Sequence, residues 1–328
     1  MNDKILDQYL VHVNNSQIEQ YDDTHHSAQD SLRGIRFKKF VRMDSSLFKD
    51  LIEEIKKNPK CGYETSLNDL IRGGYTPKHI SILQKEDNSL MSAPNSFKLG
   101  HFKDVCASRI LNFLECPTSY ETVMEINRRS FSCSVDFGKF GEDFYTVGSI
   151  FPIHKNASHD LFEIVPQLVE KLSFFSSRKN IEDKDNSMFA DFVSDYCYSR
   201  MVRKYILSDS DYGYHNVGLI HNLEKNSFRL APNFDLEWAF DFIDDRPTIF
   251  TRNKELKNDL YYLKVHQPKV LHKFTTNLQK LCSNGQYEKL ITEVIGKNEI
   301  STKFVDRFGQ HLAEITRECN LHLEKGGK

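Results

Sequence analysis

Three polar side chains able to bind a metal ion and to position a phosphate lie close together in the sequence. Asn216 follows Asp211 by five residues, and Asp235 follows Asn216 by nineteen. Phosphoryl transfer needs a carboxylate that accepts or orients a hydroxyl proton, and oxygen ligands that hold Mg²⁺ on the nucleotide phosphates. Two aspartates and an asparagine supply such a set. The spacing therefore predicts an ATP-dependent phosphotransferase, or a degenerate relative of one.

The elements around these residues would position them. Apolar residues alternate on both sides of a turn at 224–227, which predicts a β-hairpin over 217–235. The hairpin would bring Asn216 at its start close to Asp235 at its end, and such a pair of oxygen ligands suits Mg²⁺. Asp211 would lie on the loop that leaves the preceding helix, where its carboxylate could face a hydroxyl group.

Two alternatives compete with this interpretation. Asp209 could act as the base, but the residue five positions later is Tyr214, which cannot bind Mg²⁺. The residues from Asp209 to Asn216 could instead form only a polar helix exit made of turn-favouring residues. The order of helix, loop, strand, turn and strand favours the catalytic interpretation with Asp211.

Two segments carry a resemblance to a known family. They read Asp211-x-x-x-x-Asn216-x-Gly218-Leu-Ile and Arg229-Leu-Ala-Pro-x-Phe-Asp235. Both resemble the catalytic core of the HipA-like serine/threonine kinases. The resemblance implies that Asp211 is the catalytic aspartate, that Asn216 and Asp235 bind Mg²⁺, and that ATP is the phosphate donor.

Weaker similarity to the same family extends upstream. Residues 104–114 resemble its N-lobe helix, with Asp104 where an acidic residue usually stands. A glycine pair further upstream resembles the loop that faces the phosphates. That loop implies the ATP-binding residues Gly73, Gly74, Thr76 and Lys78.

The lysine with which kinases bind the α- and β-phosphates is not where the family has it. The family places this lysine on the strand before the N-lobe helix, where the present sequence has Ser92 within residues 90–94. Lys98, a few residues later, is the predicted ATP-binding replacement, and Lys78 is a second candidate. Alternatively, Lys98 is a surface charge and the protein binds Mg²⁺–ATP with little transfer, because catalysis depends on charge neutralisation at the phosphates.

Hydrophobic patterns predict a sheet-rich first part and a helical second part. Strands are expected near residues 80–82, 90–91, 123–126 and 131–135, with turns at 85–88 and 128–130. Helices are expected near residues 44–57, 104–115, 161–172 and 189–205, and in several segments after residue 254.

This order of elements predicts an α+β fold of the two-lobed, protein-kinase-like type. Residues 1–35 would be an N-terminal arm, loosely held or flexible. Residues 36–140 would form a small, sheet-containing N-lobe, and residues 141–328 a mainly helical C-lobe that carries the metal-binding hairpin. The nucleotide would lie between the lobes, where ligand sites are favoured.

The composition excludes several classes of protein. A formal net charge of −2 provides no field for nucleic acid or anionic lipid. Seven cysteines without a C-x-x-C pair argue against a disulfide framework or a zinc site, and for a reducing compartment. The His25-His26 pair lacks partners at metal-binding spacing. No apolar run spans a membrane, and the N-terminus lacks the order of a signal peptide.

Together these features predict an ATP- and Mg²⁺-dependent serine/threonine protein kinase of the toxin or effector type that the resemblance implies. Its partners would be a protein substrate and an antitoxin, with no direct nucleic acid and no membrane. A cytoplasmic location is expected, with delivery into a host cell as the effector variant. The alternatives are a nucleotide-binding pseudokinase or interaction module, and a small-molecule kinase on the same fold.

Overall fold

The chain forms two compact units in the computed structural model. The structure describes residues 6–19, 38–58, 60–86, 101–139, 141–150, 160–182, 187–209, 212–213, 216–236, 239–240 and 249–324. The first unit comprises Met1–Phe140, Pro232–Glu237 and Glu288–Lys303, and the second comprises Gly141–Ala231, Trp238–Tyr287 and Phe304–Lys328. Several residues named from the sequence lie outside the described residues, among them Asp211, Ser92 and Lys98, and so does the strand expected at 90–91.

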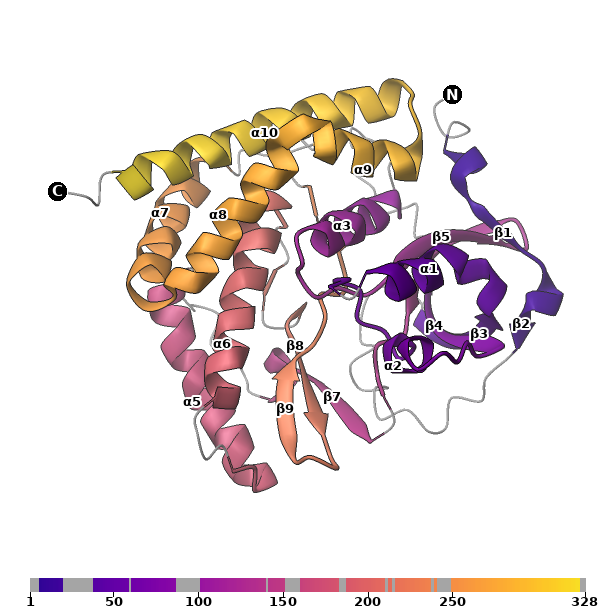
Figure 1. Ribbon diagram of the computed structural model, residues 1–328, viewed down its shortest axis with the longest axis horizontal. Helices are drawn as coiled ribbons and strands as arrows, with labels where there is room; N and C mark the ends of the chain where they lie inside the picture. The colour runs from indigo at the N-terminus through magenta and orange to yellow at the C-terminus, as the bar shows by residue number, and fades with distance from the viewer. Residues whose placement is uncertain are drawn as a thin grey trace. The chain divides into compact units, whose positions relative to one another are not determined.

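A six-stranded mixed sheet forms the centre of the first unit (Figure 1). Its strands are β1 (Val11–Val13), β2 (Ile18–Glu19), β3 (Lys38–Asp44), β4 (His79–Glu86), β5 (Glu121–Ile126) and β6 (Arg129–Val135). Their order across the sheet is β1-β5-β6-β4-β3-β2. Strand β1 pairs with β5 in parallel, and the other neighbours pair antiparallel.

The sheet has to curl because its two edge strands are close in sequence. Val13 ends β1 at one edge, and Ile18 begins β2 at the other. Five strand spacings in a flat sheet would separate these edges by about 24 Å. Five extended residues span at most about 17 Å, and residues 15–17 form a shorter 3-10 turn. The N-terminal segment therefore draws the two edges toward each other.

This arrangement corrects part of the prediction for the N-terminal arm. Residues 6–19 of the expected loose arm belong to the folded first unit and supply both edge strands. Tyr9 is packed so closely on Gly296 that a Cβ atom at Gly296 would lie 1.6 Å from the tyrosine hydroxyl. Strands of three and two residues are too short to show a hydrophobic period, so the sequence pattern gave no sign of them.

The two faces of the sheet differ in chemistry. One face is apolar and packs on α1 (Lys49–Lys57) and α2 (Asn68–Arg72); its core includes Met43, Leu51, Ile55, Ile82, Met124 and Cys133. Because side chains alternate along a strand, Lys85, Glu121 and Ser132 share the other face. Helix α3 (Phe102–Phe113) packs on that polar face through β5.

Two predicted turns are wrong in position. Residues 85–88 were expected to turn, but β4 continues through Lys85 to Glu86, and residues 87–88 lie outside the described residues. Between β5 and β6 the turn residues are Asn127 and Arg128, both with positive φ, and Arg129 already belongs to β6. The expected helix near 104–115 and the strands near 123–126 and 131–135 are confirmed as α3, β5 and β6.

The second unit is mainly helical. Its helices are α4 (Val147–Ile150), α5 (Leu161–Lys179), α6 (Ser187–Arg200), α7 (Ile249–His266), α8 (Pro268–Cys282) and most of α10 (Glu299–Glu324). Helix α9 (Gln286–Ile295) belongs mainly to the first unit. Helix α6 continues directly into a π-helix, Met201–Ile206, which ends just before the loop that was predicted to be catalytic. Such π-segments are frequent at functional sites.

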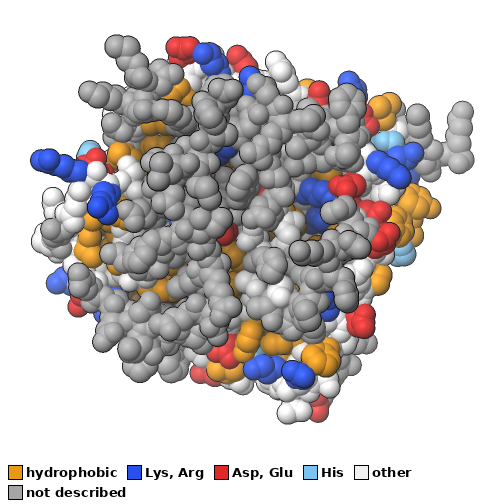
Figure 2. Space-filling model, turned by 180° about the vertical axis from the view of Figure 1, so that it is seen from behind, with side chains coloured by type: hydrophobic (Ala, Val, Ile, Leu, Met, Phe, Trp, Pro, Cys, Tyr) orange, Lys and Arg blue, Asp and Glu red, His pale blue; other side chains and the backbone are white. Residues whose placement is uncertain are grey.

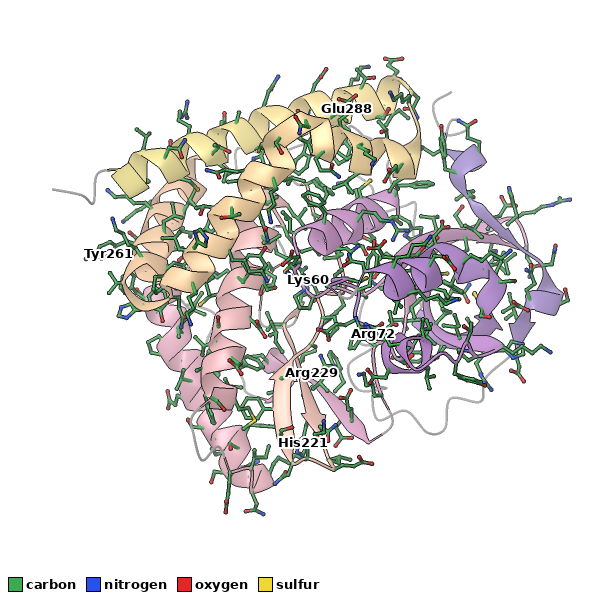
Figure 3. All side chains as sticks on the ribbon, in the orientation of Figure 1. Lys60, Arg72, His221, Arg229, Tyr261 and Glu288 are labelled. Atoms are coloured by element: carbon green, nitrogen blue, oxygen red, sulfur yellow. The ribbon has the colours of Figure 1, made fainter. Side chains whose placement is uncertain are left out.

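A three-stranded sheet of β7 (Glu142–Thr146), β8 (Gly218–Asn222) and β9 (Ser227–Leu230) completes the second unit. Strands β8 and β9 form the predicted hairpin. His221 lies on β8 and Arg229 on β9 (Figure 3). The ring of His221 packs on Phe175 of α5, whereas Arg229 lies 3.7 Å from Glu142 of β7. One hairpin face therefore packs on a helix, and the other carries both the charged Arg229 and the buried Ile220.

The predicted fold class is confirmed: an α+β chain with a curled sheet in its N-terminal part and a mainly helical C-terminal part. None of the described helices is both long and apolar enough to cross a membrane. On the face that Figure 2 shows, described Lys and Arg side chains lie among Asp and Glu side chains. That part of the described surface carries no large patch of one sign.

Candidate functional site

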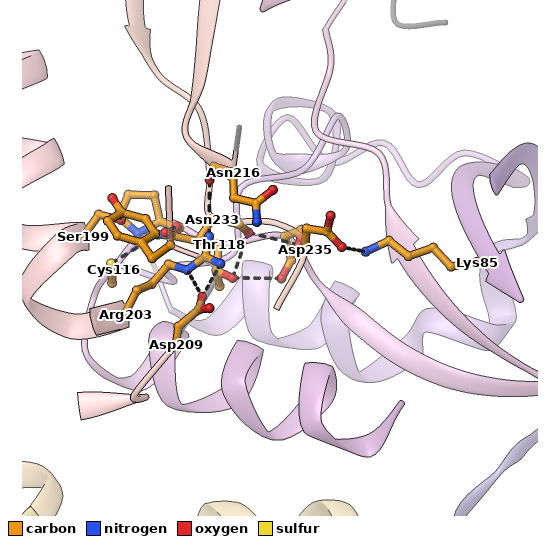
Figure 4. A network of polar contacts seen from close by, with 12 residues as sticks. Lys85, Cys116, Thr118, Ser199, Arg203, Asp209, Asn216, Asn233 and Asp235 are labelled. Atoms are coloured by element: carbon orange, nitrogen blue, oxygen red, sulfur yellow. Dashed lines mark hydrogen bonds and ion pairs between the residues drawn. The ribbon is translucent and has the colours of Figure 1, made fainter. Parts of the chain in front are cut away.

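A buried lysine of β4 contacts the predicted metal ligand Asp235 within the first unit. The Nζ atom of Lys85 lies 3.0 Å from Oδ1 of Asp235 (Figure 4). The lysine side chain is 3% exposed and the aspartate side chain 21%. The Asp235 carboxylate is therefore partly accessible to solvent, whereas the side chain of Lys85 is almost completely buried.

Two further carboxylates act on the same ammonium group. Burial alone would lower the pKa of Lys85, but the charges of Asp235, Glu121 and Asp104 outweigh burial and raise that pKa above its usual value. Glu121 lies on β5 and Asp104 on α3, and both are buried. We define Lys85, Asp104, Glu121 and Asp235 as the Lys85 cluster.

Serine hydroxyls connect the carboxylates of this cluster. Ser132 on β6 donates to Oδ2 of Asp104 at 3.1 Å and lies 3.5 Å from Oε2 of Glu121. Ser119 donates to Oε1 of Glu121 at 2.8 Å, and Ser134 donates to the same oxygen. The carboxylates are thereby fixed to the frame of the sheet, as buried charges require.

The segment that carries Asp235 is anchored on residues 117–119. The backbone N–H of Asn233 donates to the carbonyl of Pro117 at 2.8 Å, and the N–H of Ser119 donates to the carbonyl of Asn233 at 2.9 Å. The side-chain amide of Asn233 donates to the same Pro117 oxygen at 2.6 Å. Asp235 itself has φ of +55°, a left-handed conformation that is uncommon outside glycine and that clusters at functional sites.

A second buried ion pair lies in the second unit, next to the predicted catalytic loop. Arg203 of the π-helix is bound to Asp209, with Nε 2.7 Å from Oδ2, and both side chains are completely buried. Arg203 also donates to the backbone carbonyl of Asn216 at 3.3 Å, and its guanidinium lies 4.8 Å from the ring centre of Tyr212 (Figure 4). One arginine thus holds both ends of the loop from 209 to 216.

This pair bears on the choice between two aspartates considered from the sequence. A general base must reach the proton that it takes. Asp209 is buried and bound to Arg203, which makes it poorly placed to act as a base. The role of Asp211 stays a prediction.

The predicted phosphate loop and the Lys85 cluster lie at opposite ends of one strand. Gly73, Gly74, Thr76 and Lys78 are exposed and precede the first residue of β4. Lys85 follows Lys78 by seven positions along the chain, a distance of about 23 Å in an extended strand. The structure therefore does not bring these four predicted ATP-binding residues to Asp235, and Lys98, the fifth, lies outside the described residues. Asn216 belongs to the second unit and Asp235 to the first, so their joint binding of one metal ion stays a prediction.

Lys85 is the residue that the sequence interpretation missed. Its neighbours Gln84 and Glu86 make the segment look like polar turn material. One signal points to it: Lys85 lies near the end of β4, the described strand that comes before α3 in the order of elements, and protein kinases carry the phosphate-binding lysine on such a strand. The equivalence of Lys85 with that lysine is a prediction.

The residues of the cluster fit a magnesium ion bound with phosphate. A carboxylate is a hard oxygen ligand of the kind that Mg²⁺ prefers, and the side chain of Asp235 is accessible. Among the residues that the structure describes, no group of three or more His, Cys, Asp or Glu side chains could hold a metal. An ion at Asp235 would therefore take few protein ligands, as Mg²⁺ does when phosphates and water complete its coordination.

Proteins similar to this chain are found among solved structures. No protein-family model and no curated protein sequence matches the chain. Among solved structures, the chain is similar to the proinflammatory kinase CtkA of Helicobacter pylori, with 12% identity, a TM-score of 0.49, and coverage of 75% of this chain and 90% of that one.

The chain is also similar to HipA of Shewanella oneidensis MR-1, solved with HipB and operator DNA. Identity is 12%, the TM-score is 0.40, and the match covers 76% of this chain and 62% of that one. Likenesses of this strength carry no information about activity, which has to be argued from the residues of this chain. By structural likeness, the chain is similar to CtkA and HipA.

Proposed function

We propose that the protein is an ATP- and Mg²⁺-dependent phosphotransferase, and specifically a serine/threonine protein kinase. The observation that carries the proposal is the 3.0 Å contact between the buried ammonium of Lys85 and the accessible carboxylate of Asp235. A kinase needs a lysine on the strand before a helix, an acid on that helix, and an aspartate for the metal. Lys85, Asp104 and Asp235 supply these groups in that order.

Each residue has a role in this proposal. Lys85 binds the α- and β-phosphates as a point charge, and Asp235 binds Mg²⁺ together with Asn216. Asp211 accepts or orients the proton of the attacking hydroxyl. Mg²⁺–ATP supplies the transferable γ-phosphoryl group when bound. The chain contributes positioning and charge, which are the main protein contributions to phosphoryl transfer.

The charge of the Lys85 cluster supports the uptake of a cation. One ammonium faces three carboxylates, so the formal charge of the cluster is −2. An excess of buried charge is unfavourable unless an ion of opposite sign neutralises it. A divalent cation beside Asp235 would balance this excess.

Lys85 also bears on the alternative that the protein is a pseudokinase. That alternative was based on Ser92 standing where a lysine was expected, and Lys85 is the candidate that we propose for this lysine. The motif resemblance further favours a protein substrate, with phosphate transfer to Ser or Thr, and a protein partner of the antitoxin type. A small-molecule substrate would be the outcome if no protein accepts phosphate.

The test is phosphate transfer from γ-labelled ATP with Mg²⁺, to the protein itself and to added proteins. We expect transfer by the wild type and by Asp69→Asn, which alters an exposed aspartate of the same unit. Asp235→Asn and Asp211→Ala should each lower transfer by at least about 100-fold. Thermal stabilisation by Mg²⁺–ATP without any transfer would contradict the enzyme and leave a nucleotide-binding protein.

A further inference from the structure

A short backbone ladder carries the segment of Asp235 in the first unit. Thr118 forms a parallel β-bridge with Asn233 and a second parallel β-bridge with Tyr63 (Figure 4 shows Thr118 and Asn233 beside Asp235). The N–H of Thr118 donates to the carbonyl of Gly62 at 2.9 Å. Three segments that are far apart in the sequence are thereby paired, and we define residues 62–64, 117–119 and 233 as the Thr118 ladder.

The C-terminal half of helix α3 is attached to this ladder by hydrogen bonds. The hydroxyl of Ser108 donates to the backbone carbonyl of Ser119 at 2.7 Å. One turn later, the side-chain oxygen of Asn112 accepts from the backbone N–H of Gly62 at 2.6 Å. Helix α3 therefore binds two of the three ladder segments through backbone groups of the ladder.

Arg109 adds a cation to the same attachment. Its guanidinium donates to the hydroxyl of Tyr63 at 2.6 Å and lies 4.3 Å from the ring centre of Tyr120, the residue that follows the ladder. Both tyrosines are buried, and their rings contact each other edge to face. A guanidinium over an aromatic face is attracted by the ring, so this contact opposes a rotation of α3 away from the ladder.

A close backbone approach leaves little room for movement of α3. A Cβ atom at Gly62 would lie 3.0 Å from Cα of Asn112 and 3.2 Å from its carbonyl oxygen. Both are backbone atoms, so the helix itself would have to shift. The φ of Gly62 lies outside the left-handed region, so its place in the ladder depends on the missing side chain and not on an unusual backbone conformation.

The ladder connects two acids of the Lys85 cluster. Asp104 lies one helical turn before Ser108, so the two side chains share a face of α3. Asp235 follows Asn233 by two residues. Between Ser108 and Asn233 stands only Ser119, which accepts from the first at 2.7 Å and donates its N–H to the carbonyl of the second at 2.9 Å.

We propose that the Thr118 ladder fixes α3 and the segment of Asp235 to one another, so that Asp104 and Asp235 keep their places in the Lys85 cluster together and α3 is not a movable switch. In protein kinases the position of the corresponding helix is a point of control. The consequence for catalysis rests on the proposed kinase function, whereas the attachment of α3 does not.

Amide hydrogen exchange of the full chain tests the attachment and needs no enzymatic activity. Gly62→Ala places a methyl group against the backbone of α3, and Gly138→Ala is the matched control, because its methyl group would meet only a movable side chain. In Gly62→Ala we expect exchange to rise about fivefold in residues 102–113, and to a similar extent in residues 118–119 and 233–235. Gly138→Ala should exchange like the wild type.

Two results of this measurement would overturn the proposal. Faster exchange confined to residues 102–113 would show that α3 moves independently of the segment of Asp235. Unchanged exchange in α3 would show that the contact with Gly62 does not hold the helix. If Gly62→Ala does not fold, Ser108→Ala replaces it, because it removes one hydrogen bond between α3 and the ladder and should give the same joint change at a smaller size.

Steady-state kinetics tests the consequence for catalysis. Because a shift of α3 would displace both acids, Gly62→Ala should raise the KM for ATP and the Mg²⁺ concentration for half-maximal rate, each by about tenfold. Gly138→Ala should leave both within about twofold. A rise in the KM for ATP with an unchanged requirement for Mg²⁺ would contradict the joint placement. A wild type that transfers no phosphate, together with the joint rise in exchange in Gly62→Ala, would defeat the kinase function alone.

Discussion

The two buried ion-pair networks of this protein differ in charge balance and in access. In the second unit, Arg203 and Asp209 form a one-to-one pair, and neither side chain is exposed. In the first unit, Lys85 is 3% exposed, its partner Asp235 is 21% exposed, and two further carboxylates surround the ammonium. A balanced, sealed pair has nothing left to offer a ligand. A cluster with an excess of negative charge and one accessible carboxylate can offer that carboxylate to a ligand.

This difference separates residues that stabilise a loop from residues that are available to bind a ligand. Arg203 also donates to the backbone carbonyl of Asn216 and packs its face on Tyr212, so it connects residues at both ends of the segment 209–216. Asp235 stands in a left-handed backbone conformation on an anchored segment. Such local strain is kept where the surroundings enforce it, commonly at binding sites.

The largest expected effect is on stability, from Arg203→Met. Removal of one partner leaves Asp209 buried and unpaired, which should lower the free energy of unfolding by about 3–5 kcal/mol. Urea unfolding followed by far-ultraviolet circular dichroism measures this change. Arg229→Met is the control, because that arginine is 37% exposed and makes a looser pair, and its change should stay within about 1 kcal/mol.

The double variant Arg203→Met with Asp209→Leu sharpens this result. Replacement of a buried pair by apolar residues is often neutral, so the double variant should recover most of the lost stability. If Arg203→Met cost no more than Arg229→Met, the sealed pair would not be structural, and the comparison between the two networks would break down.

The next largest effect is on activity, from Lys85→Arg. The change keeps the positive charge, so stability should change by no more than about 1–3 kcal/mol, the usual cost of added volume in a core. The planar guanidinium cannot replace a compact ammonium, so kcat/KM for ATP should fall by about 100- to 1,000-fold. Steady-state kinetics with ATP as the varied substrate measures this loss.

Lys139→Arg is the matched control for this change. That lysine belongs to the same unit, is 35% exposed and pairs with the exposed Asp69, so its replacement should leave kcat/KM within about twofold. Full activity of Lys85→Arg would show that the cluster is only structural, like the Arg203 pair.

Lys85 is an example of a candidate site residue that could not be predicted from the sequence. The α3, β5 and β6 patterns and the β8–β9 hairpin could be predicted, because each repeats an apolar period over several residues. The metal-ligand candidates could be predicted from local spacing. Lys85 could not, because its partner lies 150 residues away and its neighbours resemble a turn. A long-range ion pair leaves no local pattern.

The two edge strands could not be predicted from the sequence for a different reason. Strands β1 and β2 have three and two residues, fewer than the four to eight over which alternation can be recognised. They exist because the neighbouring strands β5 and β3 offer backbone partners. The curl of the sheet depends on these two strands, so it could not be predicted from the sequence either.

The smallest expected effect comes from Asn233→Ala, which tests how the segment of Asp235 is held. The side-chain amide of Asn233 donates to the Pro117 carbonyl, but the backbone N–H of the same residue also donates to that oxygen. The carbonyl therefore stays satisfied when the side chain is removed. The loss should be that of the side-chain hydrogen bonds to the Pro117 carbonyl and, more weakly, to Sγ of Cys116, about 1–2 kcal/mol together, measured by urea unfolding.

The control for this variant is Asn222→Ala, which removes an exposed turn contact to the N–H of Lys225 and should change stability by less than about 0.5 kcal/mol. With the backbone anchors intact, Asn233→Ala should raise the KM for ATP by no more than a few-fold, because Asp235 keeps its place. A loss of stability above about 3 kcal/mol would contradict this expectation. It would mean that the side chain of Asn233, rather than the backbone pairing with residues 117–119, holds the Asp235 carboxylate against Lys85.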